Sequence, residues 1–211
     1  MKKIGWIYAG LVLVAVGCEA PIDNRKLLDE LVVTTNYDPE ADFGEYATYA
    51  IPTDTIGFST NTDPNDTIII QSENNYPRPV LDAIRANLED RGYTRVDRTA
   101  NPDLGVNVTL VNDYSVFQQV TYPGGYYGGY YSGYYGYGSY YSYPYVNTYA
   151  YNTGVLIIEI IDLKNPIQNK VKVIWSSYMG DIYSANDGGD LILQSEKGVD
   201  QSFIQSPYIQ K

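Results

Sequence analysis

Glu159 has the surroundings that best fit a general acid. It shares a predicted strand face with Val155, Ile157 and Ile161, and a carboxyl group among aliphatic side chains can have a raised pKa. Acid–base catalysis needs a second placed group, and the chain contains no histidine, the commonest general base. We therefore expect no enzymatic activity, with Glu159 at a sheet edge or opposite a lysine of the facing strand. A hydrolase that uses Asp or Glu alone is the enzymatic alternative.

Two groups of acidic and amide side chains invite comparison with cation sites. These are Asp63, Asn65 and Asp66, and then Asp181, Asp187 and Asp190. The first group lacks the register and the glycine of an EF-hand loop, and turns and helix caps account for both groups. We expect no metal and no cofactor.

Cys18 is the single cysteine of the chain, so no intramolecular disulfide can form. Lys2 and Lys3 precede a short apolar run, as in a signal peptide covering residues 1–17. The segment 15–18, Ala-Val-Gly-Cys, resembles a bacterial lipobox, in which the cysteine is acylated and becomes the mature N-terminus. We predict lipid attachment at Cys18 and a lipidated tether over residues 18–30. An ordinary secretory signal and an uncleaved anchor are the alternatives.

Net charge argues against a nucleic-acid partner. The formal charge is -11 and the isoelectric point is about 4.3. Binding to nucleic acid draws its affinity from clustered Lys and Arg, and the sequence shows no such cluster. The predicted partners are the membrane, through the lipid, and an envelope protein or polysaccharide.

Residues 122–145 form a low-complexity segment of Tyr, Gly, Ser and Pro without a charge or an aliphatic side chain. One interpretation is a long loop between strands, because this composition cannot build a packed core. The other is an adhesive surface, since tyrosine offers large amphipathic contact area at low rotamer cost. The candidate contact residues are Tyr126, Tyr130, Tyr131 and Tyr134.

A β-hairpin over residues 154–181 is the predicted centre of the fold. Its first arm is a β-branched run, and Asn165-Pro166 is the expected turn, because proline lacks the N–H donor that a ladder needs. In the second arm, alternation predicts one face built from Val171, Val173, Trp175, Ser177 and Met179. A strand at 104–111 is expected to have one core face and one mostly solvated face.

The remaining elements flank this hairpin. Strands are predicted at 31–37 and 46–51, and residues 52–75 read as a long loop with one short edge strand at 67–71. Helices are predicted at 79–91, ended by Gly92, and after Asp190 as the cap, with Ile192, Val199 and Phe203 on one stripe. The fold class is α+β: a mainly antiparallel sheet with two helices on one face, in a single domain over residues 31–211.

Several short motifs of this domain resemble the DUF4136 family of bacterial envelope lipoproteins. They lie at residues 42–50, 92–93, 102–106, 154–162, 173–175 and 203–207. The resemblance implies a lipoprotein of the cell envelope, and it supplies no catalytic residues. We expect the lipid anchor at the outer membrane, with the domain at the periplasmic face or at the cell surface. We therefore expect a non-enzymatic scaffold or accessory module, with an envelope glycan-binding module that uses the tyrosine segment as the alternative.

Overall fold

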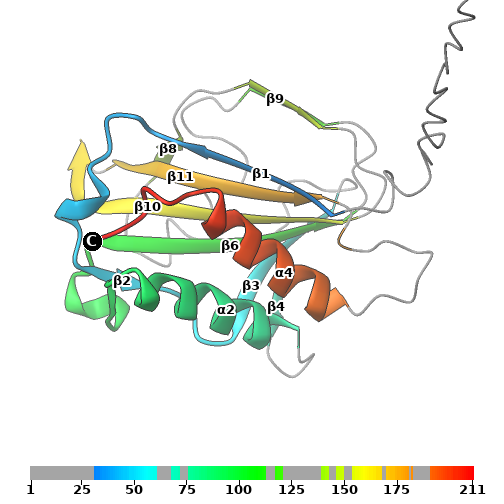
Figure 1. Cartoon of the computed structure of the whole chain (residues 1–211), viewed down its shortest axis with the longest axis horizontal. Coiled ribbons are helices and arrows are strands. Elements are labelled where there is room, and N and C mark those ends of the chain that lie inside the picture. Colours follow the sequence, from blue (N-terminus) through cyan, green and yellow to red (C-terminus); the bar gives the residue numbers. More distant parts are fainter. Residues whose placement is uncertain are drawn as a thin grey trace, which may run out of the picture.

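A computed structural model describes residues 31–60, 68–71, 76–112, 117–120, 139–142, 146–149, 154–167, 170–180, 182 and 191–211 (Figure 1). The predicted signal peptide, Cys18, the tether and the four candidate tyrosines lie outside these residues. Both groups of possible cation ligands also lie outside them, including Asp190, the predicted helix cap.

Nine of the described strands form one mixed sheet. Its main path runs β1 (Val32–Tyr37), β11 (Lys170–Gly180), β10 (Val155–Ile167), β6 (Leu104–Asn112), β2 (Thr48–Ala50) and β5 (Thr94–Arg95). β3 (Thr55–Thr60) pairs with β6 and with β4 (Ile68–Gln71), and β8 (Ser139–Ser142) pairs with β11. β7 (Phe117–Val120) and β9 (Val146–Tyr149) form a separate pair. The long pairings are antiparallel and the parallel ones are short, which confirms the predicted α+β class.

The β10–β11 hairpin is the centre of the sheet, as predicted, because both strands have partners on two sides. The expected turn at Asn165-Pro166 is wrong. β10 continues through Pro166 to Ile167, which pairs with Lys170. Pro166 is tolerated there because the register is interrupted between Asp162 and Ile167, so its missing N–H falls where the ladder is already irregular.

A β-bulge corrects the predicted face of β11. Ile160 pairs with Trp175, but the next residue, Ile161, pairs with Val173, so Ile174 is an extra residue. An extra residue reverses the alternation beyond it. Val171 and Val173 therefore lie on the face opposite Trp175, where they form a small buried cluster with β10 residues.

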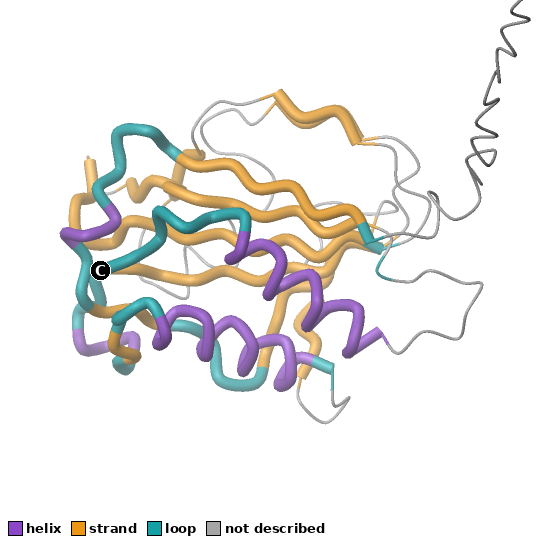
Figure 2. Tube along the Cα trace, in the orientation of Figure 1, coloured by secondary structure: helices purple, strands orange, loops and turns teal. Residues whose placement is uncertain are grey.

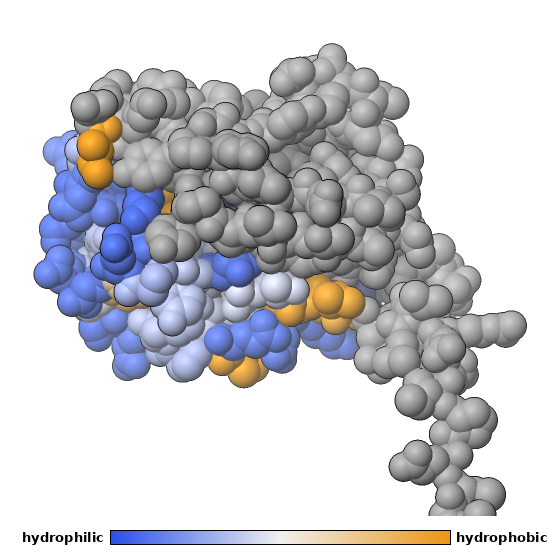
Figure 3. All heavy atoms as spheres, turned by 90° about the horizontal axis from the view of Figure 1, so that it is seen from above, coloured by the Kyte–Doolittle hydropathy of each residue, from blue (hydrophilic) through white to orange (hydrophobic). Residues whose placement is uncertain are grey.

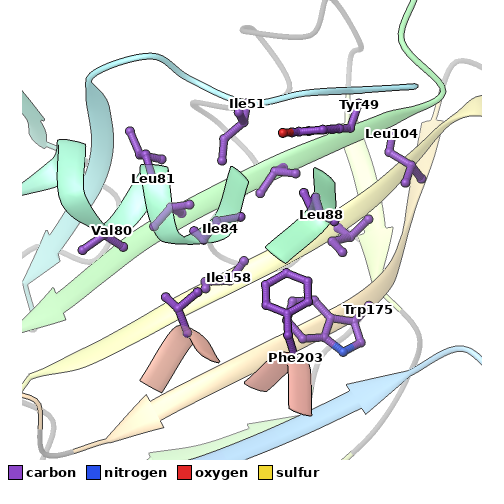
Figure 4. Close-up of a cluster of buried hydrophobic side chains, with 14 of the residues drawn as sticks. Tyr49, Ile51, Val80, Leu81, Ile84, Leu88, Leu104, Ile158, Trp175 and Phe203 are labelled. Carbon is purple, nitrogen blue, oxygen red and sulfur yellow. The ribbon is translucent and has the colours of Figure 1, made fainter. Parts of the chain in front are cut away.

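Both helices cover the same face of the sheet, as predicted (Figures 1 and 2). α2 spans Pro77–Asp90 and α4 spans Leu191–Ile204. The chain leaves α2 through Gly92, whose N–H donates to the Glu89 carbonyl at 2.9 Å and whose φ of 91° lets the following Tyr93 N–H reach the Leu88 carbonyl at 3.2 Å. The core lies between the helices and the sheet (Figure 4) and includes Tyr49, Ile84, Leu88, Val106, Leu110, Ile158, Trp175, Met179, Val199 and Phe203.

The opposite face of the sheet, called the back face here, is buried as well. Asn107 is 1 % exposed and Thr109 is 5 % exposed. The prediction that this face of β6 is mostly solvated is therefore wrong. Polar residue types alone do not show whether a face meets water.

Two strands lie in segments predicted as loops. The sequence of β3, Thr-Ile-Gly-Phe-Ser-Thr, lies in a polar stretch and does not predict a strand. β3 forms because it pairs with β4 and β6. β8 falls inside the tyrosine segment 122–145 and runs parallel to β11. The expected short edge strand is confirmed as β4.

Ser206, just after α4, fixes the C-terminus to the sheet. The Trp175 indole donates from Nε1 to Ser206 Oγ at 2.9 Å, and neither residue is more than 1 % exposed. The Trp175 ring also stacks on Phe203 of α4, with centroids 5.4 Å apart. One buried hydrogen bond and one ring contact therefore join α4 to β11.

Replacing Ser206 with Ala should lower the free energy of unfolding by about 1–3 kcal/mol, because the indole N–H would stay buried without its acceptor. Urea unfolding followed by tryptophan fluorescence measures the loss. The neighbouring exposed residue provides the control, and Gln205→Ala should change stability by less than about 0.5 kcal/mol. Equal effects of the two replacements would contradict the role given to this bond.

Candidate functional site

Residues of the motif 42–50 gather around one end of the sheet. Asp42 caps the short 3-10 helix η1 (Phe43–Glu45) by accepting from Gly44 N–H at 3.0 Å. The buried Tyr46 hydroxyl donates to Asp162 Oδ2 at 3.0 Å. Burial and then the Asp162 carboxylate raise the pKa of Tyr46 far above its usual value, so the phenol stays a donor.

Asp162 terminates the regular part of β10. Its Oδ1 accepts from the backbone N–H groups of Lys164 and Asn165, each at 2.9 Å. Its Oδ2 accepts from the Asn165 side-chain amide at 3.0 Å and from Tyr46. Four hydrogen bonds use the acceptor capacity of this carboxylate, which holds the irregular end of β10 against η1.

Asp103 joins the start of β6 to β2. Its Oδ2 accepts from the N–H groups of Ala47 at 2.7 Å and Thr48 at 3.0 Å, and its own N–H donates to Thr48 Oγ1. Burial alone would raise the pKa of Asp103, but the hydrogen bonds from Ala47 and Thr48 outweigh it, so the pKa lies below its usual value of 3.8.

Two further tyrosines link α2 to β2 and the segment after α2 to η1. Tyr49 donates to Glu89 Oε1 at 3.3 Å, and Tyr93 donates to the Phe43 carbonyl at 3.0 Å. Burial raises the pKa of Tyr93 to about 12, so it too remains protonated at neutral pH. These side chains link segments that are distant in the sequence, and they are called the motif cluster here. They are Asp42, Tyr46, Tyr49, Tyr93, Asp103 and Asp162.

Glu159 lies on the back face of β10, in the middle of the sheet. The predicted edge position is wrong, because β10 pairs with both β6 and β11. The predicted facing lysine is wrong too, since the residues opposite Glu159 are Asn107 and Ser176. All three are buried. Glu159 does share its face with Val155, Ile157 and Ile161, as expected.

Asn107 is the residue of interest that the sequence reasoning missed. Both polar atoms of its side chain are buried without a hydrogen-bond partner, and so is Nδ2 of Asn36. The information that would identify Asn107 is the β6–β10 register, which places it beside Glu159. A single sequence does not give that register, and residue type alone predicts that Asn107 is solvated.

The exposed apolar side chains of the described residues are scattered. They are Val32, Tyr37, Ile167, Leu193 and Ile204. Seen from above, the hydrophobic residues that are described stand apart among hydrophilic ones (Figure 3). Within the described residues, no helix is long and apolar enough to cross a membrane, and no three acidic or cysteine side chains are grouped as metal ligands.

Comparison with known proteins gives a family and a fold. A sequence model of DUF4136, a domain of unknown function, matches residues 33–208. The crystal structure of a DUF4136 family protein from Bacteroides thetaiotaomicron is 28 % identical, with a TM-score of 0.57, and the match covers 86 % of this chain and 98 % of that one. No curated protein matches the sequence.

Two more distant structures are also similar over 86 % of the chain. A PDZ domain protein from Parabacteroides distasonis is 16 % identical, with a TM-score of 0.46 and 37 % of its own chain covered. A PelC dodecamer from Paraburkholderia phytofirmans is 12 % identical, with a TM-score of 0.39 and 99 % of its chain covered. Neither bears on the function of this chain.

Replacing Asp103 with Asn should lower stability at pH 7 by about 1–2 kcal/mol, because charge-assisted hydrogen bonds to Ala47 and Thr48 become neutral ones. The folded pKa of Asp103 is lowered, so its contribution is present above 3.8 and is lost as the pH falls through the folded value. Urea unfolding at pH 7 and pH 3 should show the gap between the two proteins shrinking.

The exposed Asp90 provides the control, and Asp90→Asn should leave stability nearly unchanged at both pH values. A gap between wild type and Asp103→Asn that does not depend on pH would contradict the assigned role of the carboxylate.

Proposed function

This chain belongs to the DUF4136 family, and from that premise we propose that it is a non-enzymatic lipoprotein of the bacterial cell envelope. In this proposal it acts by contact, as a scaffold or accessory subunit. The lipid holds the domain at the outer membrane, and the folded part presents a surface to an envelope partner.

The motif cluster is the observation that supports a contact role. Its side chains of chemical interest, Tyr46, Asp103 and Asp162, are each engaged in hydrogen bonds that join distant segments. The tyrosine hydroxyls are held protonated by burial. A nucleophile or general base must be available to a substrate, whereas these groups are occupied in holding the fold.

The membrane attachment in this proposal rests on Cys18. A lone thiol after an apolar run and small residues is typical of a lipidated mature N-terminus. One acyl chain binds a membrane only marginally, whereas two or three chains anchor stably, at about 0.8 kcal/mol for each buried methylene group. Residues 18–30 would connect the lipid to β1.

A glycan-binding module that uses the tyrosine segment is the second candidate. Its candidate contacts, Tyr126, Tyr130, Tyr131 and Tyr134, supply aromatic faces for stacking against sugar rings. β8 is the part of this segment that the structure describes, and its pairing with β11 attaches the segment to the sheet. This candidate shares the lipid anchor with the first and differs in the chemistry of the partner.

Cys18→Ser should abolish incorporation of an alkyne-tagged fatty acid in living cells, while wild type and the control Glu19→Gln are labelled. The hydroxyl of serine cannot replace the thiol as the acceptor of the lipid. In-gel detection of the tag measures it. An unlabelled wild type that stays with the membrane would point to an uncleaved anchor, and an unlabelled soluble one to an ordinary secretory signal; both would overturn lipidation.

A photo-crosslinking residue at Tyr131 should capture a single envelope protein in living cells, identified by mass spectrometry. The contact role predicts this because the tyrosine segment supplies a large amphipathic surface. A probe at the exposed Asp90, at the end of α2, is the control and should not capture the same protein. Glycan adducts would favour the second candidate, and no adduct from the exported protein would argue against both.

A further inference from the structure

Four polar side chains form a row across the back face of the sheet. In spatial order they are Asn36 on β1, Ser176 on β11, Glu159 on β10 and Asn107 on β6, and each is the direct cross-strand partner of the next. Directly paired residues point to the same face, so the four belong together. Three strand spacings separate the ends, about 14 Å. The row is called the polar row below.

Three residues of the polar row are buried and Asn36 is partly buried, and hydrogen-bond partners are missing at the two ends of the row. Ser176 and Asn107 are each 1 % exposed, and Glu159 is 8 % exposed. Asn107 lacks a partner at both Nδ2 and Oδ1, and Asn36 lacks one at Nδ2. Buried polar groups in native proteins are nearly always paired. Two free donors and one free acceptor, at the two ends of one row, mark a place where a polar molecule would be bound.

The polar groups of the row restrict the class of ligand that could bind there. An anion would meet the Glu159 carboxylate, which repels it. A divalent cation prefers several carboxylate oxygens, and Glu159 is the only carboxylate of the row. An apolar ligand would leave the Asn107 amide unpaired at the same cost. A neutral ligand that both donates and accepts hydrogen bonds remains, and vicinal hydroxyl groups have this property.

An aromatic residue stands next to the row. Tyr178 lies two residues along β11 from Ser176, on the same face, and pairs with Ile157 and Thr34. Its side chain is 2 % exposed. Small-molecule sites combine apolar and aromatic walls with a few placed polar groups, and this part of the back face has that composition.

We propose that the polar row, Asn36, Ser176, Glu159 and Asn107, is a binding site for a neutral saccharide. Hydroxyl groups donate to Glu159 and to Oδ1 of Asn107, and accept from the side-chain amides at the two ends of the row. Because three of its four residues are buried, binding requires a local opening of the molecule and is slow compared with binding at an open groove. The site is separate from the lipid anchor and from the four candidate tyrosines.

The test uses the full lipidated chain in a detergent without a sugar headgroup. Cellotriose, maltotriose and chitotriose are the neutral probes, and calcium chloride and sodium phosphate are the charged ones. After long equilibration, at least one trisaccharide should raise Tm by several degrees, and titration calorimetry gives its Kd. Asn107→Leu, which keeps a similar volume, should weaken that binding about tenfold or more.

Asn107→Leu should also raise Tm of the ligand-free protein, because a buried amide without partners is replaced by an apolar side chain. Asn87→Leu on α2 is the matched control. Asn87 donates to Asp200 and to the Ala83 carbonyl, so its replacement should lower Tm and leave saccharide binding intact.

Three results would overturn the proposal. None of the three trisaccharides raises Tm of the wild type while Asn107→Leu is stabilised, which would mean that the row holds water only. Calcium or phosphate binds in place of the saccharides. Asn107→Leu lowers Tm, which would mean that the amide is paired in solution. Each of these outcomes leaves the lipid anchor and the contact role untouched.

Discussion

Burial of the central strands on both faces is the constraint on which the rest of this structure depends. Residues 155–163 of β10 and 173–180 of β11 turn neither face to water, so every polar group there needs a partner within the protein or a bound molecule. On the helix side the requirement is met by short contacts. Ser177 and Ser202 share a hydrogen bond of 2.6 Å, and Ser202 also donates to the Gly198 carbonyl at 2.7 Å.

On the back face the same requirement is not met at Asn107. An unpaired buried amide costs about 1–3 kcal/mol, against a total stability of about 5–15 kcal/mol for a typical domain. An aliphatic side chain on this strand would avoid that cost, as Val106 and Val108 do on the other face. Asn107 therefore lowers the stability of the fold, and residues that do so are typical of binding sites.

The sequence was sufficient for elements whose pattern is local. The alternation of Leu104 to Leu110 and the stripe of Val80, Ile84 and Leu88 depend only on neighbours along the chain. What failed depends on pairing. The sequence around Ile174 does not indicate the bulge. β3 forms only through its pairing with β4 and β6, and the burial of Asn107 follows from its place beside Glu159. Cross-strand register depends on the tertiary fold, so a single sequence does not predict the polar row.

The residues that resemble the family are not the residues that we propose to bind a ligand. The motifs that resemble the family include Asp42, Tyr46 and Asp103, and the structure uses these residues to fix η1, β2 and the end of β10. They carry the fold, so in the proposed contact role recognition resides in other residues, which can change without loss of the fold. The polar row meets that condition in an unusual way, because replacing Asn107 should strengthen the fold while it removes the ligand contacts. A residue whose loss stabilises the protein is better explained by what it binds than by what it supports.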